Sequence, residues 1–151
     1  MSGNERRVLF VCIHNSARSQ MAEAFLNKYG NGRYIAESAG LEPGKMNPNV
    51  IKVMQEVGMD LSQKKTQGVL DLLKKDKHYH MVITVCDQAS AEKCPVFPGG
   101  GKRLAWSFED PSSFKGTPEE VLHFTRAVRD EIEHKIKNFM EESRLESYWI
   151  Q

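Results

Sequence analysis

Residues 7–24 read Arg7-Val-Leu-Phe-Val-Cys-Ile-His-Asn-Ser-Ala-Arg-Ser-Gln-Met-Ala-Glu-Ala24 and decide how the chain begins to fold. The segment opens with Val8–Val11, an apolar run with the length and composition of a buried strand. It closes in a helical pattern that we expect to span Ser19–Tyr29, with Ser19 as its cap. A cysteine therefore leaves the end of a strand, and a short polar loop leads from it into a helix.

The loop between this strand and this helix has the composition of an oxyanion site. Backbone N–H groups converge in such a loop, and the helix N-terminus adds positive potential, so a tetrahedral anion can bind there. The same field favours the nucleophilic thiolate form of Cys12. Arg18 offers a planar fork of donors that suits two oxygens of phosphate or arsenate. The alternative is that Cys12 is a buried structural cysteine and Arg18 a surface residue without a function in binding, because the short pattern C-x5-R often occurs by chance.

We therefore predict that Cys12 and Arg18 are catalytic. Ser16 and Ser19 are candidates for hydrogen bonds to the thiolate, and Asn15 is a candidate for fixing the loop backbone. The predicted substrate-binding residues are Ile13, His14, Asn15, Ser16, Ala17, Arg18 and Ser19.

Length and composition limit what kind of protein this is. A chain of 151 residues predicts a single domain, 1–151, and a formal net charge of +1 gives no reason to expect nucleic acid or a membrane as a partner. The sequence has neither a signal-peptide core nor an apolar run of the ~20 residues that span a bilayer. Three cysteines without zinc spacing are typical of a reducing compartment. We expect a cytoplasmic monomer without a cofactor.

The rest of the chain alternates strand and helix patterns. The third strand pattern is a continuous apolar run, as is typical of buried parallel strands. A lysine-rich turn and two histidines, His78 and His80, precede it, and we interpret them as surface or strand-edge residues. The expected strands are Tyr34–Gly40, Met81–Val85 and Arg103–Trp106; the expected helices are Asn47–Val57 with Asn47 as cap, Gln67–Lys75, and a long helix opened by a capping box at Thr117–Glu120.

Two more cysteines flank a stretch of seven small and polar residues. Cys86 follows the Met81–Val85 strand, and in open α/β sheets active sites lie at that edge, so Cys86 is expected near Cys12. Cys94 precedes Pro95 and a run of glycines. A disulfide needs Cα atoms about 4.4–6.8 Å apart, so a Cys86–Cys94 bond would require the segment to loop out. Spacing alone favours two unrelated cysteines.

The loop Cys12-Ile-His-Asn-Ser-Ala-Arg-Ser19, with Gln20-Met-Ala-Glu23 after it, resembles the low-molecular-weight tyrosine phosphatase superfamily. Within that superfamily the chain is most similar to the thioredoxin-coupled arsenate reductases. The order Cys86, Cys94-Pro95, Trp106, Asp110-Pro111 matches theirs, although the Cys86–Cys94 spacing is one residue longer than in the best-known members. The resemblance implies a single three-layer α/β domain with a four-stranded parallel sheet flanked by helices.

The resemblance also implies roles for individual residues. Asp110 matches the general acid, with Glu109 as its rival. Cys86 and Cys94 match the second and third thiols of a disulfide relay that reduces arsenate and is regenerated by thioredoxin. Asn15, Glu23 and Ser38 of this chain match positions that help to bind a potassium ion in some arsenate reductases. The carboxylate that would complete such a site is not evident around Thr66–Gly68.

Three alternatives stay open. The first is a phosphatase acting on phosphotyrosine or small phosphoesters. Ser112 and Ser113 stand where such enzymes usually carry tyrosines, and Gln20 stands where they commonly carry proline. The second is a non-catalytic oxyanion sensor or redox adaptor. The third is a reductase that draws electrons from glutaredoxin or mycothiol.

Overall fold

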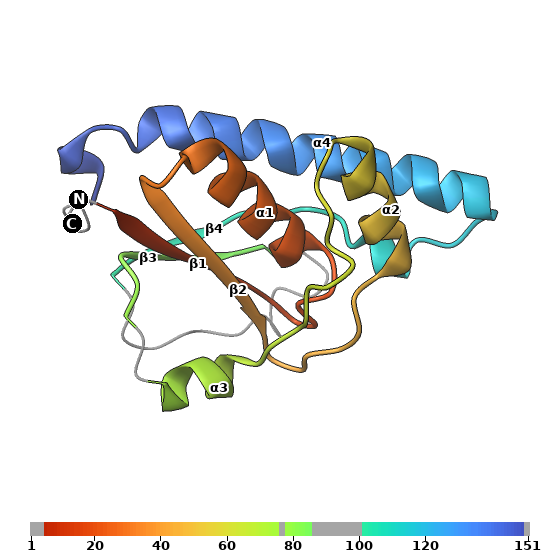
Figure 1. Ribbon diagram of the computed structural model, residues 1–151, viewed down its shortest axis with the longest axis horizontal. Helices are drawn as coiled ribbons and strands as arrows, with labels where there is room; N and C mark the ends of the chain where they lie inside the picture. The colour runs from red at the N-terminus through yellow and green to blue at the C-terminus, as the bar shows by residue number, and fades with distance from the viewer. Residues whose placement is uncertain (1–4, 76–77, 86–100, 150–151) are drawn as a thin grey trace.

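The computed structural model describes residues 5–75, 78–85 and 101–149 and has an α/β architecture (Figure 1). Its parallel sheet has the strand order β2-β1-β3-β4, which confirms the predicted fold class. The strands are β1 (Arg6–Cys12), β2 (Tyr34–Gly40), β3 (Met81–Thr84) and β4 (Lys102–Ala105). The helices are α1 (Arg18–Gly30), α2 (Pro48–Glu56), α3 (Val69–Lys74) and α4 (Pro118–Glu142), with two 3-10 turns, η3 (Pro111–Ser113) and η4 (Glu146–Trp149).

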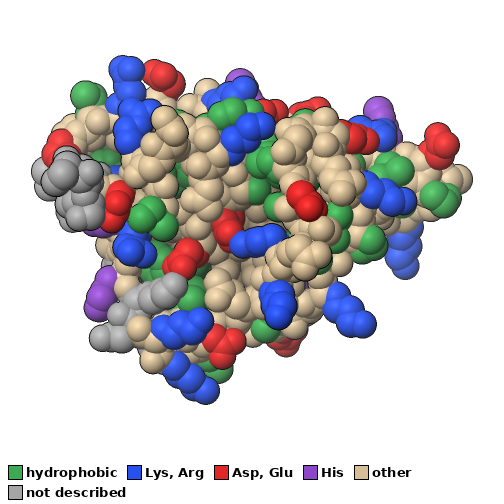
Figure 2. All heavy atoms as spheres, in the orientation of Figure 1, with side chains coloured by type: hydrophobic (Ala, Val, Ile, Leu, Met, Phe, Trp, Pro, Cys, Tyr) green, Lys and Arg blue, Asp and Glu red, His purple; other side chains and the backbone are tan. Residues whose placement is uncertain are grey.

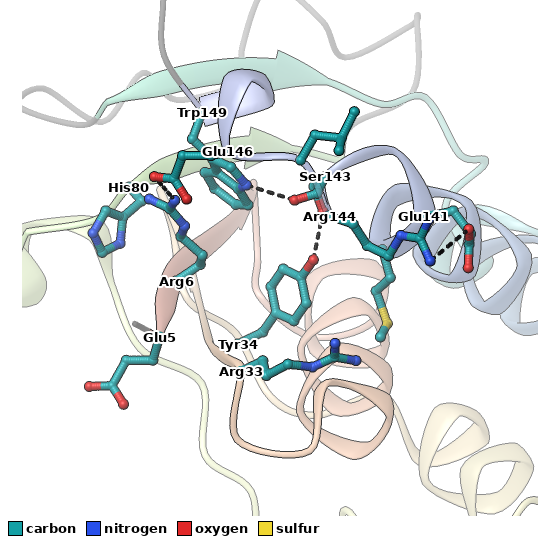
Figure 3. Close-up of a pocket in the computed structure, with 12 residues that line it drawn as sticks. Glu5, Arg6, Arg33, Tyr34, His80, Glu141, Ser143, Arg144, Glu146 and Trp149 are labelled. Carbon is teal, nitrogen blue, oxygen red and sulfur yellow. Dashed lines mark hydrogen bonds and ion pairs between the residues drawn. The ribbon is translucent and has the colours of Figure 1, made fainter. Parts of the chain in front are cut away.

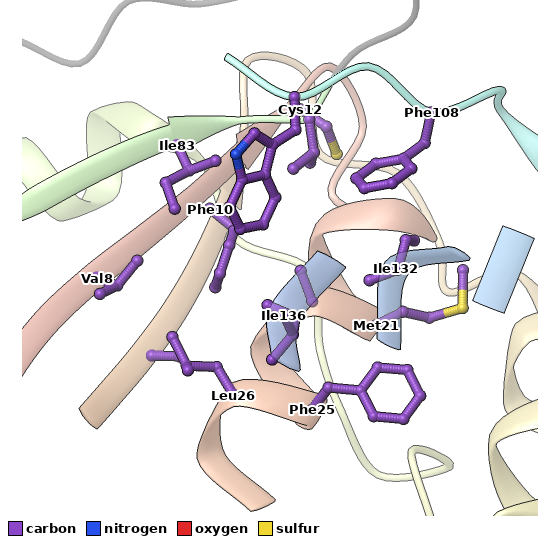
Figure 4. Packing of buried hydrophobic residues seen from close by; sticks show 14 of the residues in the cluster. Val8, Phe10, Cys12, Met21, Phe25, Leu26, Ile83, Phe108, Ile132 and Ile136 are labelled. Atoms are coloured by element: carbon purple, nitrogen blue, oxygen red, sulfur yellow. The ribbon is translucent and has the colours of Figure 1, made fainter. Parts of the chain in front are cut away.

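The sheet lies between two layers. Helices α1, α2 and α4 cover one face, and α3 covers the other (Figure 1). Strand β1 supplies both cores because its side chains alternate: Phe10 packs on the α1 and α4 side, whereas Leu9 packs with Leu72 of α3. Figure 4 shows the larger cluster, with Cys12 and Phe108 at the end where β1 finishes.

The strand order determines where a ligand can approach. The chain leaves β1 for β2 on one side and later adds β3 on the other side, so the connections diverge at the carboxyl end of β1. In open parallel sheets the binding crevice forms at this kind of switch point. Cys12, the last residue of β1, stands there.

The first and third helices start at different residues from those predicted. Helix α1 begins at Arg18 after Ala17, and no side chain caps it, so the predicted Ser19 cap is wrong. Helix α3 begins at Val69 rather than Gln67 because Gln67 bonds outward: its backbone N–H binds Asn15 Oδ1 at 2.9 Å and its carbonyl accepts Gly40 N–H at 2.9 Å.

The long C-terminal helix follows its predicted pattern. The Thr117–Glu120 capping box is present, and Val128, Ile132 and Ile136 of α4 are buried in the larger hydrophobic cluster. Trp149 of η4 folds back and donates its indole N–H to the Ser143 carbonyl at 2.8 Å. Acidic and basic side chains intermingle on the visible face of the molecule (Figure 2). Among the described residues, no helix combines the length and the apolar character that a bilayer crossing requires.

Candidate active site

Cys12 is held by donors from the loop that follows it. Its side chain is only 3% exposed, and its Sγ accepts the backbone N–H of Asn15 at 3.1 Å. The Ser19 hydroxyl lies 2.9 Å from the same sulfur. Hydrogen bonds of this kind stabilise a thiolate relative to a thiol. Ser19 therefore faces the cysteine from the first turn of α1 instead of capping that helix.

Asn15 fixes the shape of the loop. It is fully buried and adopts φ 57°, a left-handed conformation that asparagine tolerates better than most residues. Its side-chain amide donates to Ser19 Oγ at 2.8 Å, and its Oδ1 accepts the N–H of Gln67 at 2.9 Å. A chain of hydrogen bonds thus runs from the 64–68 segment through Asn15 and Ser19 to the Cys12 sulfur.

The end of β2 lies against this loop, as the small residues of that strand suggest. A Cβ atom on Gly40 would be 2.7 Å from the Ile13 carbonyl oxygen and 2.8 Å from the Asn15 nitrogen. No side chain fits at that separation, so position 40 requires glycine. The close approach lets Leu41 and Glu42 donate backbone N–H groups to the carbonyls of Cys12 and Ile13.

Arg18 connects the loop with the segment before η3. Its side chain is buried, Nη1 donates to the Phe108 carbonyl at 3.0 Å, and Nη2 lies 3.6 Å from Asp110 Oδ2. Its Nε is also buried and has no hydrogen-bond partner among the described residues. Buried guanidinium donors are normally satisfied, so this nitrogen is available to an acceptor in the loop.

Asp110 is brought to the site by a tight turn. Its Oδ1 accepts the Ser112 N–H at 3.0 Å, which caps η3, and Ser113 donates its hydroxyl to Oδ2 at 3.3 Å. Glu109, the rival acid, is exposed, whereas Asp110 is partly buried and faces Arg18. The geometry therefore favours Asp110 over Glu109 as the carboxylate of this site.

The structure brings together Cys12, Asn15, Arg18, Ser19 and Asp110. Cys86 and Cys94 lie outside the described residues. His14 bonds the Glu42 carbonyl through Nδ1 at 3.0 Å, on the outside of the loop. The Ser16 carbonyl accepts the Asn47 N–H at 3.1 Å, so Ser16 ties the loop to the start of α2.

The residues matched to a potassium site have other partners. Ser38 donates its hydroxyl to Glu23 Oε1 at 2.6 Å, and the ammonium group of Lys64 forms an ion pair with Glu23 Oε2. Asn15 directs its oxygen to Gln67 and Gln20. No cluster of three histidine, cysteine or acidic side chains able to hold a metal occurs in the described ranges. The potassium possibility stays a prediction.

Gln20 is a site residue whose contacts the sequence did not reveal. It is fully buried, and its Nε2 lies 3.2 Å from the Asn15 carbonyl and 3.3 Å from the Lys65 carbonyl. Lys64, which pairs with Glu23, was missed as well. The presence of Gln20 where phosphatases commonly carry proline indicated that this position is unusual, but it did not indicate the partners. Gln20 and Lys65 are 45 residues apart in the sequence, and Glu23 and Lys64 are 41 residues apart.

A depression, drawn in Figure 3, lies where strands β1 and β2 begin, at the end of the sheet opposite to Cys12. This cavity of about 640 Å³ is formed by the starts of β1 and β2, the end of α4 and η4. Tyr34 and Trp149 both turn toward Ser143 in it, and the Tyr34 hydroxyl lies 2.7 Å from Ser143 Oγ. Of the predicted catalytic residues that the structure describes, Cys12, Arg18 and Asp110, none lines it.

Known proteins resemble this chain in sequence and in fold. The model of the family described as low molecular weight phosphotyrosine protein phosphatase matches residues 7–147. An arsenate reductase of Halalkalibacterium halodurans is 40% identical over 139 residues, which cover 91% of this chain and 97% of that protein.

Two solved structures show the same relation. An arsenate reductase in the phosphate-binding state superposes with a TM-score of 0.72 at 31% identity, covering 91% of this chain and 98% of that chain. A thioredoxin-dependent arsenate reductase of Corynebacterium glutamicum superposes with a TM-score of 0.65 at 26% identity, covering 94% of this chain and 63% of that chain.

Proposed function

The chain belongs to the low molecular weight phosphotyrosine protein phosphatase family, and from that premise we propose that it reduces arsenate to arsenite. The observation that carries the proposal is the combination of a buried, doubly hydrogen-bonded Cys12 sulfur with a buried guanidinium from Arg18, the first residue of the helix that follows the loop. The similarity to arsenate reductases over nine-tenths of the chain selects arsenate among tetrahedral oxyanions.

The first step uses residues that the structure describes. The Cys12 thiolate forms a bond to arsenic while the loop N–H groups and Arg18 bind the remaining oxygens. One arsenate hydroxyl leaves as water after it accepts a proton, and Asp110 is the proposed donor. The unpartnered Nε of Arg18 supports the proposed role of Arg18 in binding the anion, because an oxyanion oxygen would supply the acceptor that this nitrogen lacks.

The second step uses the two cysteines outside the described ranges. We propose that the Cys86 thiolate attacks Cys12 Sγ, so that the electron pair of the sulfur–arsenic bond passes to arsenic and arsenite leaves. Cys94 then attacks Cys86 by thiol–disulfide exchange and frees Cys12 as a thiolate. The dithiol of thioredoxin reduces the Cys86–Cys94 disulfide. The Corynebacterium glutamicum neighbour, which is named thioredoxin-dependent, supports this choice of donor.

The chain is proposed to act as one domain, a monomer of the cytoplasm. Support for one domain comes from the single sheet, because both hydrophobic clusters share strands β1 and β3.

Phosphomonoester hydrolysis is the second candidate function. It needs only a cysteine, an arginine and an acid, and Cys12, Arg18 and Asp110 are all present in the described site. The name of the matched family favours this candidate as well. It requires neither Cys86 nor Cys94, so those two residues separate the two functions.

A coupled assay tests the proposal. Purified protein is mixed with thioredoxin, thioredoxin reductase and NADPH, and loss of NADPH is followed after arsenate is added. We expect oxidation that requires arsenate and disappears in Cys86→Ser. Cys94→Ser should complete one turnover and stop as a Cys12–Cys86 disulfide, which mass spectrometry of tryptic peptides detects. Aryl phosphate hydrolysis that survives Cys86→Ser, without any arsenate-dependent oxidation, would instead establish the phosphatase.

A further inference from the structure

The carboxyl group of Asp110 has a fixed position relative to Ser112. Asp110 caps the short turn η3 through Oδ1, which accepts the Ser112 N–H at 3.0 Å. Pro111 between them is buried and restricts the backbone. Wherever Ser112 is held, the Asp110 carboxyl group is therefore held as well.

Ser112 is in turn held by Asn47, the residue that caps α2. Asn47 Nδ2 donates to Ser112 Oγ at 2.8 Å, across 65 residues of sequence. Its Oδ1 accepts the Asn49 N–H at 2.8 Å. Its backbone N–H donates to the carbonyl of Ser16 at 3.1 Å, and Ser16 belongs to the loop of residues 12–18 that is proposed to bind the anion, called the anion loop below. One asparagine thus contacts the anion loop, helix α2 and the turn that carries the acid.

We infer that Asn47 is a positioning residue that sets the Asp110 carboxyl group against the anion bound beside Cys12. The inference rests on the proposed role of Asp110 as the proton donor. Capping alone does not require asparagine, because serine, threonine and aspartate cap helices about as well. What asparagine adds is an amide donor on the same side chain as the capping oxygen, and here that donor is directed to Ser112.

The turn that carries the proposed acid, residues 110–113, has further contacts on both sides. Before the turn, Arg18 holds the Phe108 carbonyl at 3.0 Å. After it, Phe114 stacks on Phe124 of α4, with ring centroids 4.3 Å apart and planes 9° apart. Among the described residues, the middle of the turn is linked to the anion loop by the Asn47–Ser112 hydrogen bond and by the longer ion pair between Arg18 Nη2 and Asp110 Oδ2, at 3.6 Å. Loss of the Asn47 contact should leave the turn folded but let the carboxyl group shift.

The test uses variants that separate the cap from the contact. Asn47→Ser keeps a capping oxygen but lacks the amide that reaches Ser112, and Ser112→Ala removes the acceptor without touching α2. Asn49→Ser, in the same helical turn, is the matched control. For each single variant and for the double variant, kcat/KM is measured with two aryl phosphates. The leaving group of phenyl phosphate needs a proton, whereas the leaving group of dinitrophenyl phosphate does not. Single-turnover arsenite formation from arsenate is measured in parallel.

Loss of the contact should affect the proton-dependent reaction selectively. A general acid contributes about 10²–10⁴-fold, and we expect each single variant to lose roughly tenfold of this with phenyl phosphate and with arsenate. The dinitrophenyl ester should change by less than about twofold, since its leaving group needs no acid. The double variant should be no worse than either single variant, because both remove one interaction.

Equal losses with both esters would overturn the inference, because they would indicate a general disturbance of the site. Unchanged rates with phenyl phosphate would overturn it too. The proposed reductase function fails separately: if the wild-type protein hydrolyses the esters but forms no arsenite, arsenate is not the substrate. The ester comparison then still decides the role of Asn47.

Discussion

The parallel strands begin at one end of the sheet, called the amino edge here, and finish at the other, the carboxyl edge. Both edges carry an arginine, but the two arginines have different contacts. At the carboxyl edge the guanidinium of Arg18 is buried, and one of its nitrogens has no partner among the described residues. At the amino edge Arg6 is paired with Glu146 at 2.5 Å and lies 4.9 Å from the Trp149 ring centroid. The first arginine has a buried donor left for a ligand, whereas the second directs a donor to Glu146 and its planar face to Trp149.

The cavity and the candidate active site also lie at opposite edges. The depression of about 640 Å³ is beside Arg6, while the carboxyl edge offers a short loop wrapped around one sulfur. A small tetrahedral anion needs converging N–H groups more than it needs volume. For an anion site, an unsatisfied buried donor such as Arg18 Nε is therefore a better indication than the size of a cavity.

Replacing the arginine at each edge should give the largest contrast. Arg18→Lys loses the planar fork and should lower kcat/KM for arsenate by roughly 10²–10³-fold, as loss of a donor to a developing anion does. Arg6→Lys keeps the positive charge beside Glu146, changes only a surface ion pair of the kind that contributes about 0–1 kcal/mol, and should leave kcat/KM unchanged. Steady-state kinetics of both variants check the contrast, and equal losses would contradict the assignment of Arg18.

Each edge also has a glycine with no room for a side chain. A Cβ atom on Gly40 would be 2.7 Å from the Ile13 carbonyl oxygen, and one on Gly101 would be 2.5 Å from the His80 carbonyl oxygen. Both alanine variants should lose about 1–3 kcal/mol of unfolding free energy. Only Gly40→Ala displaces the anion loop, so only it should also lose activity, by roughly 10²-fold. Urea unfolding and kinetics on the same samples separate the two effects.

Two buried serine hydroxyls provide a smaller contrast. Ser19→Ala removes the hydroxyl 2.9 Å from the Cys12 sulfur, and a hydrogen bond to a charged group contributes about 1.5–3 kcal/mol. The kcat/KM for arsenate should therefore fall by at least about tenfold. Ser143→Ala removes the partner of Tyr34 at the other edge and should cost about 1 kcal/mol of stability without changing kcat/KM. An unchanged kcat/KM in Ser19→Ala would contradict a role for this hydroxyl.

The sequence predicted what depends on neighbouring residues. A strand, a loop and a helix follow one another within residues 7–24, so the loop geometry around Cys12 could be inferred from local pattern alone. The Asn47 cap and the Thr117 capping box are also local, and both are present. Asp110 was identified by resemblance, since an Asp-Pro pair alone predicts only a turn.

The errors and omissions involve contacts between distant segments. Ser19 is a good capping residue by type, but its hydroxyl lies against the Cys12 sulfur. Gln67 fits a helical pattern, but its backbone groups bond to Asn15 and Gly40. The Asn47–Ser112 hydrogen bond joins residues 65 positions apart. Side chains whose partners come from another segment cannot be assigned from periodicity, because the pattern carries no information about tertiary neighbours.

The smallest expected effect concerns pH, and it belongs to the amino edge. His80 Nδ1 accepts the Arg7 N–H at 2.9 Å, so the neutral imidazole is the form that fits. Partial burial and the charges of Arg6 and Arg7 hold the pKa of His80 below its ordinary value of 6.5. The unfolded chain therefore binds a proton at a higher pH than the folded chain does. The stability that depends on neutral His80 is complete above pH 6.5 and declines as the pH falls toward the folded pKa.

His80→Asn tests this pH dependence because the asparagine oxygen can accept the same N–H without titrating. The difference in unfolding free energy between wild type and variant, measured by urea titration, should be constant above pH 6.5 and shift in favour of the variant below it. The kcat for arsenate should respond to neither change, since His80 lies at the edge that we place outside the chemistry. A parallel loss of kcat in His80→Asn would show that the two edges are coupled and that the amino edge affects the chemistry.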